Sequence, residues 1–512
     1  MTRWRHPIAV AAAAAFLAGC TSGPDFERPE KPTADRYTPE SLAPSTSSAP
    51  TDGGSAQSFV QSMDIPGQWW TLFQSRELNA LVEEAMRANP DLDAAQAALR
   101  QARENFFAAQ GGLFPSLSGN AGGQQQQATG FQQGLGAATQ IYGVTTASLN
   151  VSYSVDVFGG IRRQVESQQA LAEVARYQLE ATYLTLTSNV AAAAINIASL
   201  RAQIQATQDI IRIQSDSLGV VRRQFDLGGA SRADVLAQEA ALAQTQATLP
   251  PLQKQLAIQR NQLMTLLGRR PDQDRGETFD LAKLKLPTEL PLSLPSQLVE
   301  QRPDVRVAEA QLQSASANIG VAIANQLPQF NITALLGMAS GGLQTAFSPG
   351  TGIWTLAASV AQVMFDGGTL EHQKRAAVAA FDRAAAQYRS TVLLAFQDVA
   401  NALRALQTDA DALKAQAAAE NTAAASLQLA QQQFELGAVN YLILLNAQTT
   451  YQNARINRLR AQAARYSDTA ALFQALGGGW WNRSDVDPKS LGKPDRFNLP
   501  PVQDIKLPRA GH

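Results

Sequence analysis

The pattern of apolar and polar residues predicts two very long helices. Residues 161–218 contain neither Gly nor Pro, and residues 369–436 also lack both. Apolar side chains recur there at every seventh position, from Tyr183 to Phe225 and from Val392 to Leu413. Since a helix rises about 1.5 Å per residue, each would be about 100 Å long. A sustained seven-residue repeat is typical of left-handed supercoiling against neighbouring helices.

Shorter segments between the helices alternate apolar and polar residues, as β-strands do. The clearest is 149–157, and 330–334 alternates similarly, whereas 117–123 and 354–365 alternate more weakly. Residues 149–157 have the length with which a tilted strand crosses a bilayer, about 9–11 residues. Residues 122–143, rich in Gly and Gln, are expected to form a loop. A soluble antiparallel sheet with one wet face would show the same alternation.

The predicted elements occur twice along the chain. Asn89-Pro90-Asp91 recurs as Arg302-Pro303-Asp304, 213 positions later. Gln224-Phe225-Asp226-Leu227-Gly228 recurs as Gln433-Phe434-Glu435-Leu436-Gly437, 209 positions later. A repeat of this length indicates a duplicated half-protein, in which each long helix and its return helix form a hairpin. Pro250-Pro251 predicts a break in the first return helix, because Pro removes backbone donors and clashes with the preceding turn.

The expected fold is mainly α with a small β part. A segment rich in Pro, Ser, Thr and Gly is expected to be a tether that runs over a surface. From the N-terminus we expect a signal peptide at 1–19, the tether at 20–66, two repeats at 67–277 and 278–481, and a Pro-rich tail at 482–512. In the first repeat we expect strands at ~115–128 and ~145–158, a long helix at ~160–227 and a return helix at ~231–268. In the second repeat we expect strands at ~328–340 and ~353–366, a long helix at ~368–436 and a return helix at ~440–476.

The N-terminus predicts export and lipid attachment. A basic region at 2–6 and a brief apolar run at 8–17 are typical of a secretory signal peptide and too short to span a membrane. Leu17-Ala18-Gly19-Cys20 resembles the lipobox of bacterial lipoproteins, and Cys20 is the one cysteine of the chain. We expect several acyl chains on Cys20, which together anchor a protein firmly. Thr21, which follows the cysteine, favours placement in the outer membrane. The alternative to a lipobox is an ordinary signal peptide in which Cys20 is incidental.

Composition excludes several other classes of protein. The 512 residues carry 42 Lys+Arg against 43 Asp+Glu, so a polybasic nucleic-acid binder is not expected. One Cys and three His exclude a disulfide framework and a Cys/His metal cluster. No phosphate loop or dinucleotide motif follows a predicted strand. We therefore expect no enzyme, no catalytic residue, no metal site and no cofactor beyond the covalent lipid on Cys20.

The number of strands predicts the oligomer. A sheet that spans a membrane must close, because an open edge leaves unsatisfied backbone groups in lipid. Four strands cannot close, and a dimer with eight would fill its interior with side chains. A trimer would supply twelve strands around a lumen and twelve helices for a hollow tube. We therefore expect a homotrimer as the smallest conducting assembly.

Several motifs carry a family resemblance. Trp69-Trp70-Thr71-Leu72-Phe73, Glu77-Leu78-Asn79-Ala80-Leu81-Val82 and Ala88-Asn89-Pro90-Asp91-Leu92 resemble the opening of outer-membrane efflux proteins. The two Phe-x-Leu-Gly turns and the ending Ala475-Leu476-Gly477-Gly478-Gly479-Trp480 are similar to the same family. This is the TolC-like outer-membrane factor group, and the lipobox points to its lipoprotein branch, which serves resistance-nodulation-division efflux systems.

The resemblance implies a trimeric channel-tunnel of a Gram-negative outer membrane, with a 12-stranded β-barrel and a periplasmic α-barrel. It would give drugs or other toxic small molecules passive exit, and a periplasmic adaptor and an inner-membrane pump would open its periplasmic tip. Type I protein secretion and metal-ion efflux are alternatives within the family. A lipid-anchored structural coiled coil or adhesin is the alternative outside it, although such a spacer would not need paired strands.

In that family the turns of the helical hairpins form the tip, where the channel closes and the adaptor docks. By motif match these positions are Leu227, Gly228, Ser231, Leu436 and Gly437. The glycines have a second role as helix C-caps in either case.

Three further residues match positions of the closed tip in the family. Asp234 matches an acid used in polar links or a charged ring, although an Asp there also favours the start of a helix. Phe434 stands where an aromatic residue takes part in these links, but it lacks a hydroxyl and is expected to pack. Ile443 and Asn446 replace acidic residues of many members, which argues against a strong cation-binding ring.

Overall fold

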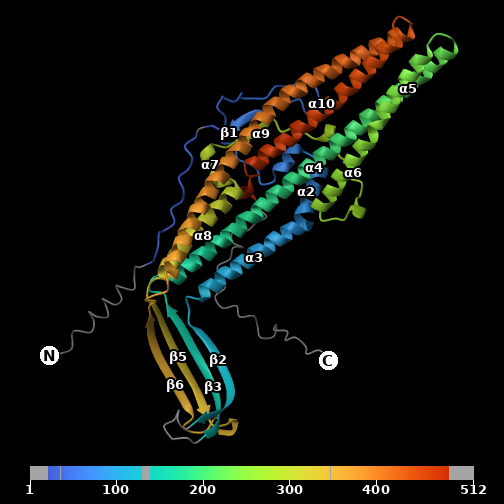
Figure 1. The fold of residues 1–512 in the computed structure, drawn as a ribbon. Coiled ribbons are helices and arrows are strands. Elements are labelled where there is room, and N and C mark those ends of the chain that lie inside the picture. Colours follow the sequence, from blue (N-terminus) through green and yellow to red (C-terminus); the bar gives the residue numbers. More distant parts are fainter. Residues whose placement is uncertain (1–20, 35, 130–138, 346, 484–512) are drawn as a thin grey trace. The chain divides into compact units, whose positions relative to one another are not determined.

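The computed structural model describes residues 21–34, 36–129, 139–345 and 347–483 (Figure 1). The predicted signal peptide at 1–19, Cys20 and nearly all of the tail at 482–512 lie outside these residues. The chain divides into two compact units. The first holds residues 98–175 and 307–389 with described residues up to 29, and the second holds 30–97, 176–306 and 390–483.

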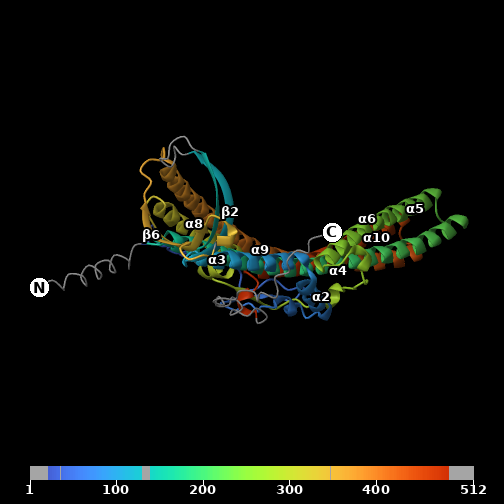
Figure 2. The same cartoon turned by 90° about the horizontal axis from the view of Figure 1, so that it is seen from below.

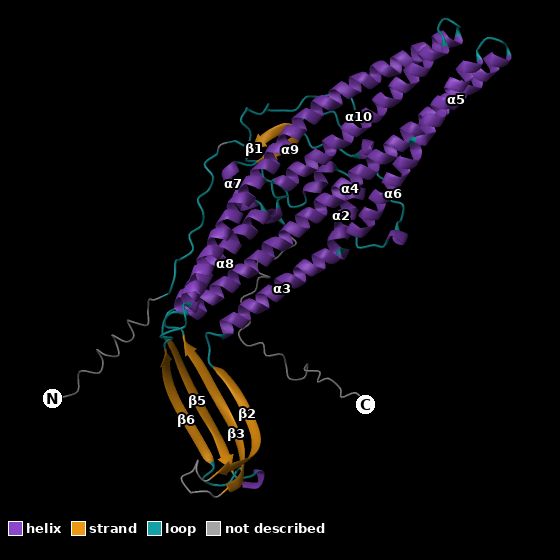
Figure 3. Cartoon of the chain, in the orientation of Figure 1, coloured by secondary structure: helices purple, strands orange, loops and turns teal. Residues whose placement is uncertain are grey.

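The first unit contains a four-stranded antiparallel sheet (Figure 3). Its strands are β2 (Ser116–Thr129), β3 (Thr139–Val155), β5 (Gln329–Ser340) and β6 (Gly352–Ala361), in the order β2-β3-β5-β6. The predicted pairs of strands are present, but much of the loop expected at 122–143 is strand. Gln124 pairs with Val144 and Gln127 with Ile141, because backbone hydrogen bonds form a ladder whatever the side chains are.

The two long helices are α4 (Gly160–Asp226) and α9 (Thr369–Glu435), each of 67 residues. Both begin shortly after a strand, at an aspartate that accepts hydrogen bonds from first-turn backbone groups. The Asp156 carboxylate accepts from the N–H groups of Ile161 and Arg162 at 3.0 and 2.9 Å. The Asp366 carboxylate accepts from those of Gly368 and Leu370, both at 2.8 Å. These caps satisfy donors that a helix start leaves unpaired.

Each long helix is followed by a return helix, as the repeat predicts. The first return helix is divided into α5 (Arg232–Ala247) and α6 (Leu249–Leu266), whereas α10 (Tyr441–Ala475) is continuous. The interruption falls at Thr248, two residues before Pro250, and the two prolines lie in the first turn of α6. Proline is tolerated there because first-turn N–H groups have no intrahelical partner.

The remaining elements complete the repeat. Each half has two helices before its pair of strands, because a proline ends the first helix in each. These helices are α2 (Arg76–Ala88), α3 (Pro90–Gly111), α7 (Pro295–Gln301) and α8 (Pro303–Ala324). Two short strands, β1 (Ser58–Gln61) and β4 (Glu289–Leu292), pair in parallel. The short 3-10 helices are η1 (Trp69–Phe73), η3 (Pro271–Gln273), η4 (Leu281–Lys283), η5 (Leu343–Thr345) and η6 (Trp480–Asn482).

The tryptophan pairs at the two ends of the repeat region both lie in the second unit, where Trp69 and Trp70 are buried and Trp480 and Trp481 are half-buried. Trp69 stacks on Phe473 with ring centroids 5.5 Å apart, and Trp480 meets Tyr177 edge-on at 5.7 Å. The Asp64 carboxylate accepts hydrogen bonds from the Trp481 indole at 3.1 Å and from the Asn482 amide at 2.8 Å. These contacts join segments 300 or more residues apart in the sequence.

The expected tether is more ordered than its composition suggests. Gln57 and Ile65 are fully buried in the second unit, and β1 pairs with β4. The buried Arg465 guanidinium donates to the carbonyls of Gly53 and Ser55, at 3.0 and 2.6 Å. Residues 44–66 therefore belong to the fold, because these specific contacts offset the entropy that a Pro- and Ser-rich chain would keep.

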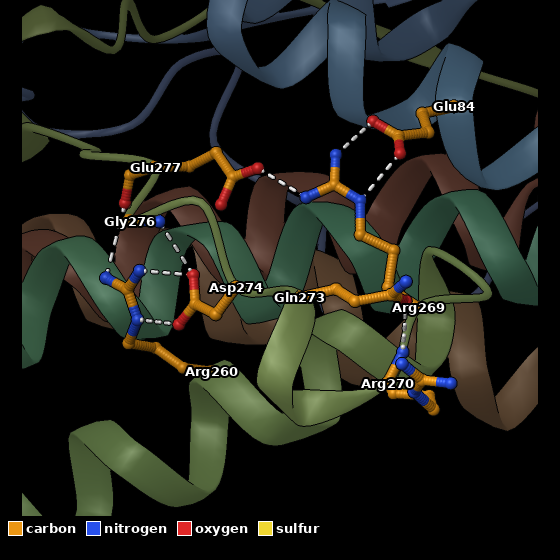
Figure 4. A network of polar contacts seen from close by, with 8 residues as sticks. All are labelled: Glu84, Arg260, Arg269, Arg270, Gln273, Asp274, Gly276 and Glu277. Atoms are coloured by element: carbon orange, nitrogen blue, oxygen red, sulfur yellow. Dashed lines mark hydrogen bonds and ion pairs between the residues drawn. The ribbon is translucent and has the colours of Figure 1, made fainter.

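A network of ion pairs fastens α2 to the segment after α6 (Figure 4). The Arg269 guanidinium binds both oxygens of Glu84, one of them at 2.6 Å, and donates to Glu277 at 2.6 Å. Arg260 binds both oxygens of Asp274, each at 2.6 Å. Arg269 lowers the pKa of Glu84 and Arg260 lowers that of Asp274, since hydrogen bonds to the charged form favour it.

Among the described residues, α4 alone contains a window long and apolar enough for a membrane span, with mean hydropathy 1.2. Of that window, 61% is buried within the protein. Its apolar positions therefore pack against other elements.

Candidate functional site

The hairpin turns use one left-handed glycine each. Gly228 has φ +80° and Gly437 has φ +71°, a conformation that costs little only without a Cβ. The following N–H closes the helix end, from Gly229 to the Gln224 carbonyl at 2.7 Å and from Ala438 to the Gln433 carbonyl at 2.8 Å. These are the hydrogen bonds of a Schellman motif, so the predicted C-cap role of both glycines is present.

The first turn ends in a reciprocal cap. The Asp234 carboxylate accepts from the Ser231 backbone N–H at 2.9 Å and from its hydroxyl at 2.7 Å. The Asp234 N–H in turn donates to the Ser231 hydroxyl oxygen at 3.2 Å. The hydrogen bond from the Ser231 side chain, together with that from its backbone, lowers the pKa of Asp234. Within the chain, Asp234 therefore starts α5, and its carboxylate stays ionised at neutral pH.

The second turn has a weaker cap and a more apolar surface. Asn440 caps α10 through its side-chain oxygen, which accepts from the Ile443 N–H at 3.2 Å. Ile443 occupies the position equivalent to Asp234, so no carboxylate can reach back to the cap. Ile443 is 47% exposed and Asn446 is also exposed. The two turns of one chain therefore differ in their charged groups, since the first carries Arg232 and Asp234 where the second carries Tyr441 and Ile443.

An apolar cluster, the tip cluster, joins the two hairpins near their turns. Figure 2 shows the return helices α5 and α10 of these hairpins extending in the same direction in the second unit. Phe434 contacts Tyr441 edge-on with ring centroids 5.9 Å apart. The cluster consists of Leu218, Val221, Val235, Leu427, Ala430, Phe434, Tyr441, Leu444 and Ala447. Because its residues come from α4, α5, α9 and α10, any separation of the hairpins at the tip exposes this apolar surface.

Tyr441 is a tip residue that the sequence analysis did not single out. Its side chain is buried, and its hydroxyl has no hydrogen-bond partner among the described residues. Burial raises the pKa of Tyr441, and the nearby Asp234 charge raises it further. The duplication offered a signal, because Tyr441 aligns with Arg232 at a shift of 209 and thus replaces a cation by an aromatic ring.

A leucine projects from each turn into solvent. Leu227 is 87% exposed and Leu436 is 84% exposed, whereas most leucines of the hairpins are packed. Exposed apolar groups at equivalent places on two neighbouring turns form a surface suited to an apolar partner.

The sheet of the first unit separates two kinds of side chain by face. Val151 of β3 pairs with Leu117 of β2 and with Ala334 of β5, and Ala334 pairs in turn with Leu356 of β6. These four residues therefore share one face of the sheet. The opposite face carries mostly small and polar residues, among them Ser116, Ser118, Asn120, Ser148, Asn150, Ser152, Asn331, Thr333, Thr355 and Ser359. Leu117 and Leu356 are each 69% exposed. An exposed apolar face behind a polar one is the pattern of a lipid-facing barrel wall with a wet lumen.

Cys20, the predicted lipid attachment site, lies outside the described residues. In the described ranges, no group of three or more His, Cys, Asp or Glu side chains is placed to hold a metal ion.

Comparison with known proteins gives one consistent result. The family model described as "Outer membrane efflux protein" matches residues 81–269 and 294–478, which correspond to the two repeats. "Cation efflux system protein CusC" of Escherichia coli O6:H1 is 29% identical over 93% of this chain and 98% of its own. "Pyoverdine export outer membrane protein OpmQ" of Pseudomonas putida is 30% identical over 85% of this chain and 93% of its own. The solved outer-membrane channel OprN has a TM-score of 0.81 and 28% identity, covering 90% of this chain and all of that one.

Proposed function

We propose a specific role for this chain from the premise that it belongs to the outer membrane efflux protein family. As a member it is an outer-membrane channel for efflux, in a Gram-negative bacterium, and it extends into the periplasm. Its particular role is the exit duct of a tripartite pump that expels drugs or other toxic small molecules. The chain itself supplies passage and no catalytic step.

The proposal rests on the four-stranded sheet, whose two edge strands each have one unpaired side. Among the described strands, β2 and β6 each have a neighbour on one side only. In lipid those open edges would leave backbone N–H and C=O groups unpaired, at several kcal/mol each. If β6 of each copy pairs with β2 of the next, three copies close a ring of twelve strands. The apolar face of the sheet then points outward, and the polar face lines the lumen. A homotrimer is therefore the assembly proposed.

The pump partners are proposed from the tips. The exposed Leu227 and Leu436 offer apolar contacts to a periplasmic adaptor protein, which would couple the channel to an inner-membrane pump of the resistance-nodulation-division type. Anchoring in the outer membrane would be reinforced by acyl chains on Cys20. The capped, packed turns represent a closed tip that the adaptor and pump would open.

Drug susceptibility in the source strain tests the role. Deleting the gene should sensitise cells to at least one class of drug or toxic compound, and the wild-type gene should restore resistance. Leu227→Asp with Leu436→Asp should fail to restore it although the protein reaches the outer membrane, while Leu294→Asp, which changes a 41% exposed leucine away from the turns, should succeed. Full resistance with both tip leucines replaced would contradict the docking proposal.

Labelling with radioactive palmitate tests the anchor. The wild-type protein should incorporate label and Cys20→Ala should not. Label retained by Cys20→Ala would contradict attachment at this residue.

A further inference from the structure

Three buried glutamines lie between the two hairpins of the second unit. Gln214 of α4 is 1% exposed, and Gln238 of α5 and Gln448 of α10 are fully buried. In each, the side-chain oxygen has no hydrogen-bond partner among the described residues. Nearly all buried polar atoms of proteins have a partner, so three such oxygens on three adjoining helices require an explanation.

Hydrogen bonds place these glutamines at one level. The Gln238 amide donates to the Gln214 backbone carbonyl at 2.6 Å. The Gln448 amide donates to the Ser217 hydroxyl at 2.8 Å, and Ser217 lies one turn after Gln214 on α4. We call Gln214, Gln238 and Gln448 the glutamine layer. It borders the tip cluster directly, since Ala447 and Leu218 of that cluster neighbour Gln448 and Ser217 in the chain.

The glutamine layer needs donors that its own helices do not provide. An amide oxygen can only accept, and α4 and α10 use their backbone N–H groups within the helices. Water is the donor small enough for a buried polar site and is regularly found bridging such groups. Three acceptors on three helices form a polar site of the kind that holds ordered water.

We propose that the glutamine layer binds ordered water and is the plane along which α10 separates from α4 and α5 when the tip opens. This inference rests on the proposed closed tip. Separation of apolar helices exposes apolar surface, which is unfavourable. Separation at the glutamine layer instead exposes amide oxygens that exchange hydrogen bonds from ordered water for hydrogen bonds from bulk water, at little cost. The glutamine layer thus lowers the free energy needed to open the tip, whereas the neighbouring tip cluster raises it.

Polar contacts between α10 and the first hairpin continue beyond the layer. Arg455 of α10 binds Asp209 of α4 at 3.0 Å, and Arg460 donates to the Gln203 amide oxygen at 3.0 Å. Gln452 accepts from the Thr245 hydroxyl at 3.4 Å. Opening would therefore exchange hydrogen bonds for hydrogen bonds along this contact as well.

Single-channel conductance of Gln448→Leu tests the inference. The variant replaces a side chain whose oxygen has no partner in the described part of the protein by an apolar group that suits the neighbouring cluster, at the loss of the amide's hydrogen bond to Ser217. We expect the open probability to fall at least about 5-fold and the melting temperature to rise by about 1–3 °C. Gln214→Leu, on a different helix, should act in the same direction. Wild-type open probability and melting temperature in both variants would overturn the inference.

The matched control is Gln462→Leu on the same helix. Gln462 is 2% exposed, but its amide oxygen accepts from Arg458 at 2.9 Å. Replacing it removes an amide oxygen that already has a partner in the protein and leaves Arg458 without that acceptor, so the melting temperature should fall and the open probability should not. An equal fall in open probability in Gln462→Leu and Gln448→Leu would show a general effect of buried leucine and overturn the inference.

Two further results separate this inference from the proposed function. A wild-type protein that conducts no ions would contradict the channel, whatever the glutamines do. A high-resolution map of the conducting wild type should show ordered water within about 3 Å of the layer's amide oxygens. A dry layer, in which the amides bond only one another, would overturn the inference and leave the channel intact.

Discussion

The Asp234 carboxylate accepts hydrogen bonds from both the backbone N–H and the hydroxyl of Ser231, at 2.9 and 2.7 Å. This pair closes the first hairpin turn, whereas the second turn has an isoleucine in place of the aspartate. Asp234→Ala should cost the turn about 0.5–2 kcal/mol, the usual value of a lost cap. Amide hydrogen exchange in residues 231–235 should accelerate, and channel conductance should rise as the tip loosens.

Asp226→Ala is the matched control, because it removes the same charge from the other end of the turn without touching the cap. It should leave both the exchange rates and the conductance close to wild type. Faster exchange with unchanged conductance in Asp234→Ala would assign Asp234 to the helix start alone.

Phe434 and its counterpart Phe225 offer a comparison of the two repeats. Phe434 is 9% exposed within the tip cluster, and Phe225 is 38% exposed. Phe434→Ala should destabilise the tip by about 3 kcal/mol and raise conductance, because it leaves a cavity at the contact of four helices. Phe225→Ala should have less than half the effect on hydrogen exchange at the tip. Equal effects would mean that Phe434 does not hold the hairpins together.

The two faces of the sheet predict opposite responses to charge. Val151→Arg places a cation on the apolar face of β3 and should cost about 2–4 kcal/mol near mid-membrane, so that less trimer is recovered from outer membranes. Ser152→Arg, on the polar face of the same strand, should assemble normally and change ion selectivity. Normal assembly of Val151→Arg would contradict the lipid-facing assignment.

Acid should weaken the contact between α2 and the segment after α6. The Arg269 guanidinium holds the pKa of Glu84 below its usual range. A carboxyl with a lowered folded pKa contributes its full stability above the unfolded pKa of about 4.3, and loses it as pH falls through the folded value. The melting temperature of wild type should therefore exceed that of Glu84→Gln at pH 7, and the difference should shrink towards pH 3.

Glu83→Gln controls for the general effect of acid, since Glu83 is an exposed neighbour on the same helix. Its melting temperature should track that of wild type at every pH. A constant difference between Glu84→Gln and wild type from pH 7 to pH 3 would show that the ion pair does not carry the pH dependence.

The heptad pattern shows how far sequence can predict this fold. Positions 392, 399, 406 and 413 of α9 are all buried, and beyond the half-buried Glu420 the same step of seven reaches the buried Leu427 and Phe434. In α4 the pattern holds at Val190, Ile197 and Leu218, but Ile204 and Ile211 are only half-buried and Phe225 is exposed. An α-helix has 3.6 residues per turn, so a 3.5-residue pattern drifts around a helix that is not strictly supercoiled.

Other features depend on contacts that no local pattern encodes. The β2–β3 ladder extends through Gln124–Gln127, where side-chain alternation gives no signal. Order in residues 44–66 depends on Arg465, about 400 positions away in the sequence. The burial of Tyr441 and the glutamine layer arise only when the helices of the two hairpins pack together. The turns were predictable because glycine and capping residues act over a few residues.

The most direct test is the mass of the detergent-solubilised mature protein, combined with single-channel recording in a planar lipid bilayer. The account predicts a particle of three chains that conducts, at a low level while the tip is closed and at a higher level in Asp234→Ala. A monomer or dimer without conductance would contradict the closed twelve-stranded barrel, and with it the assignment as an efflux channel.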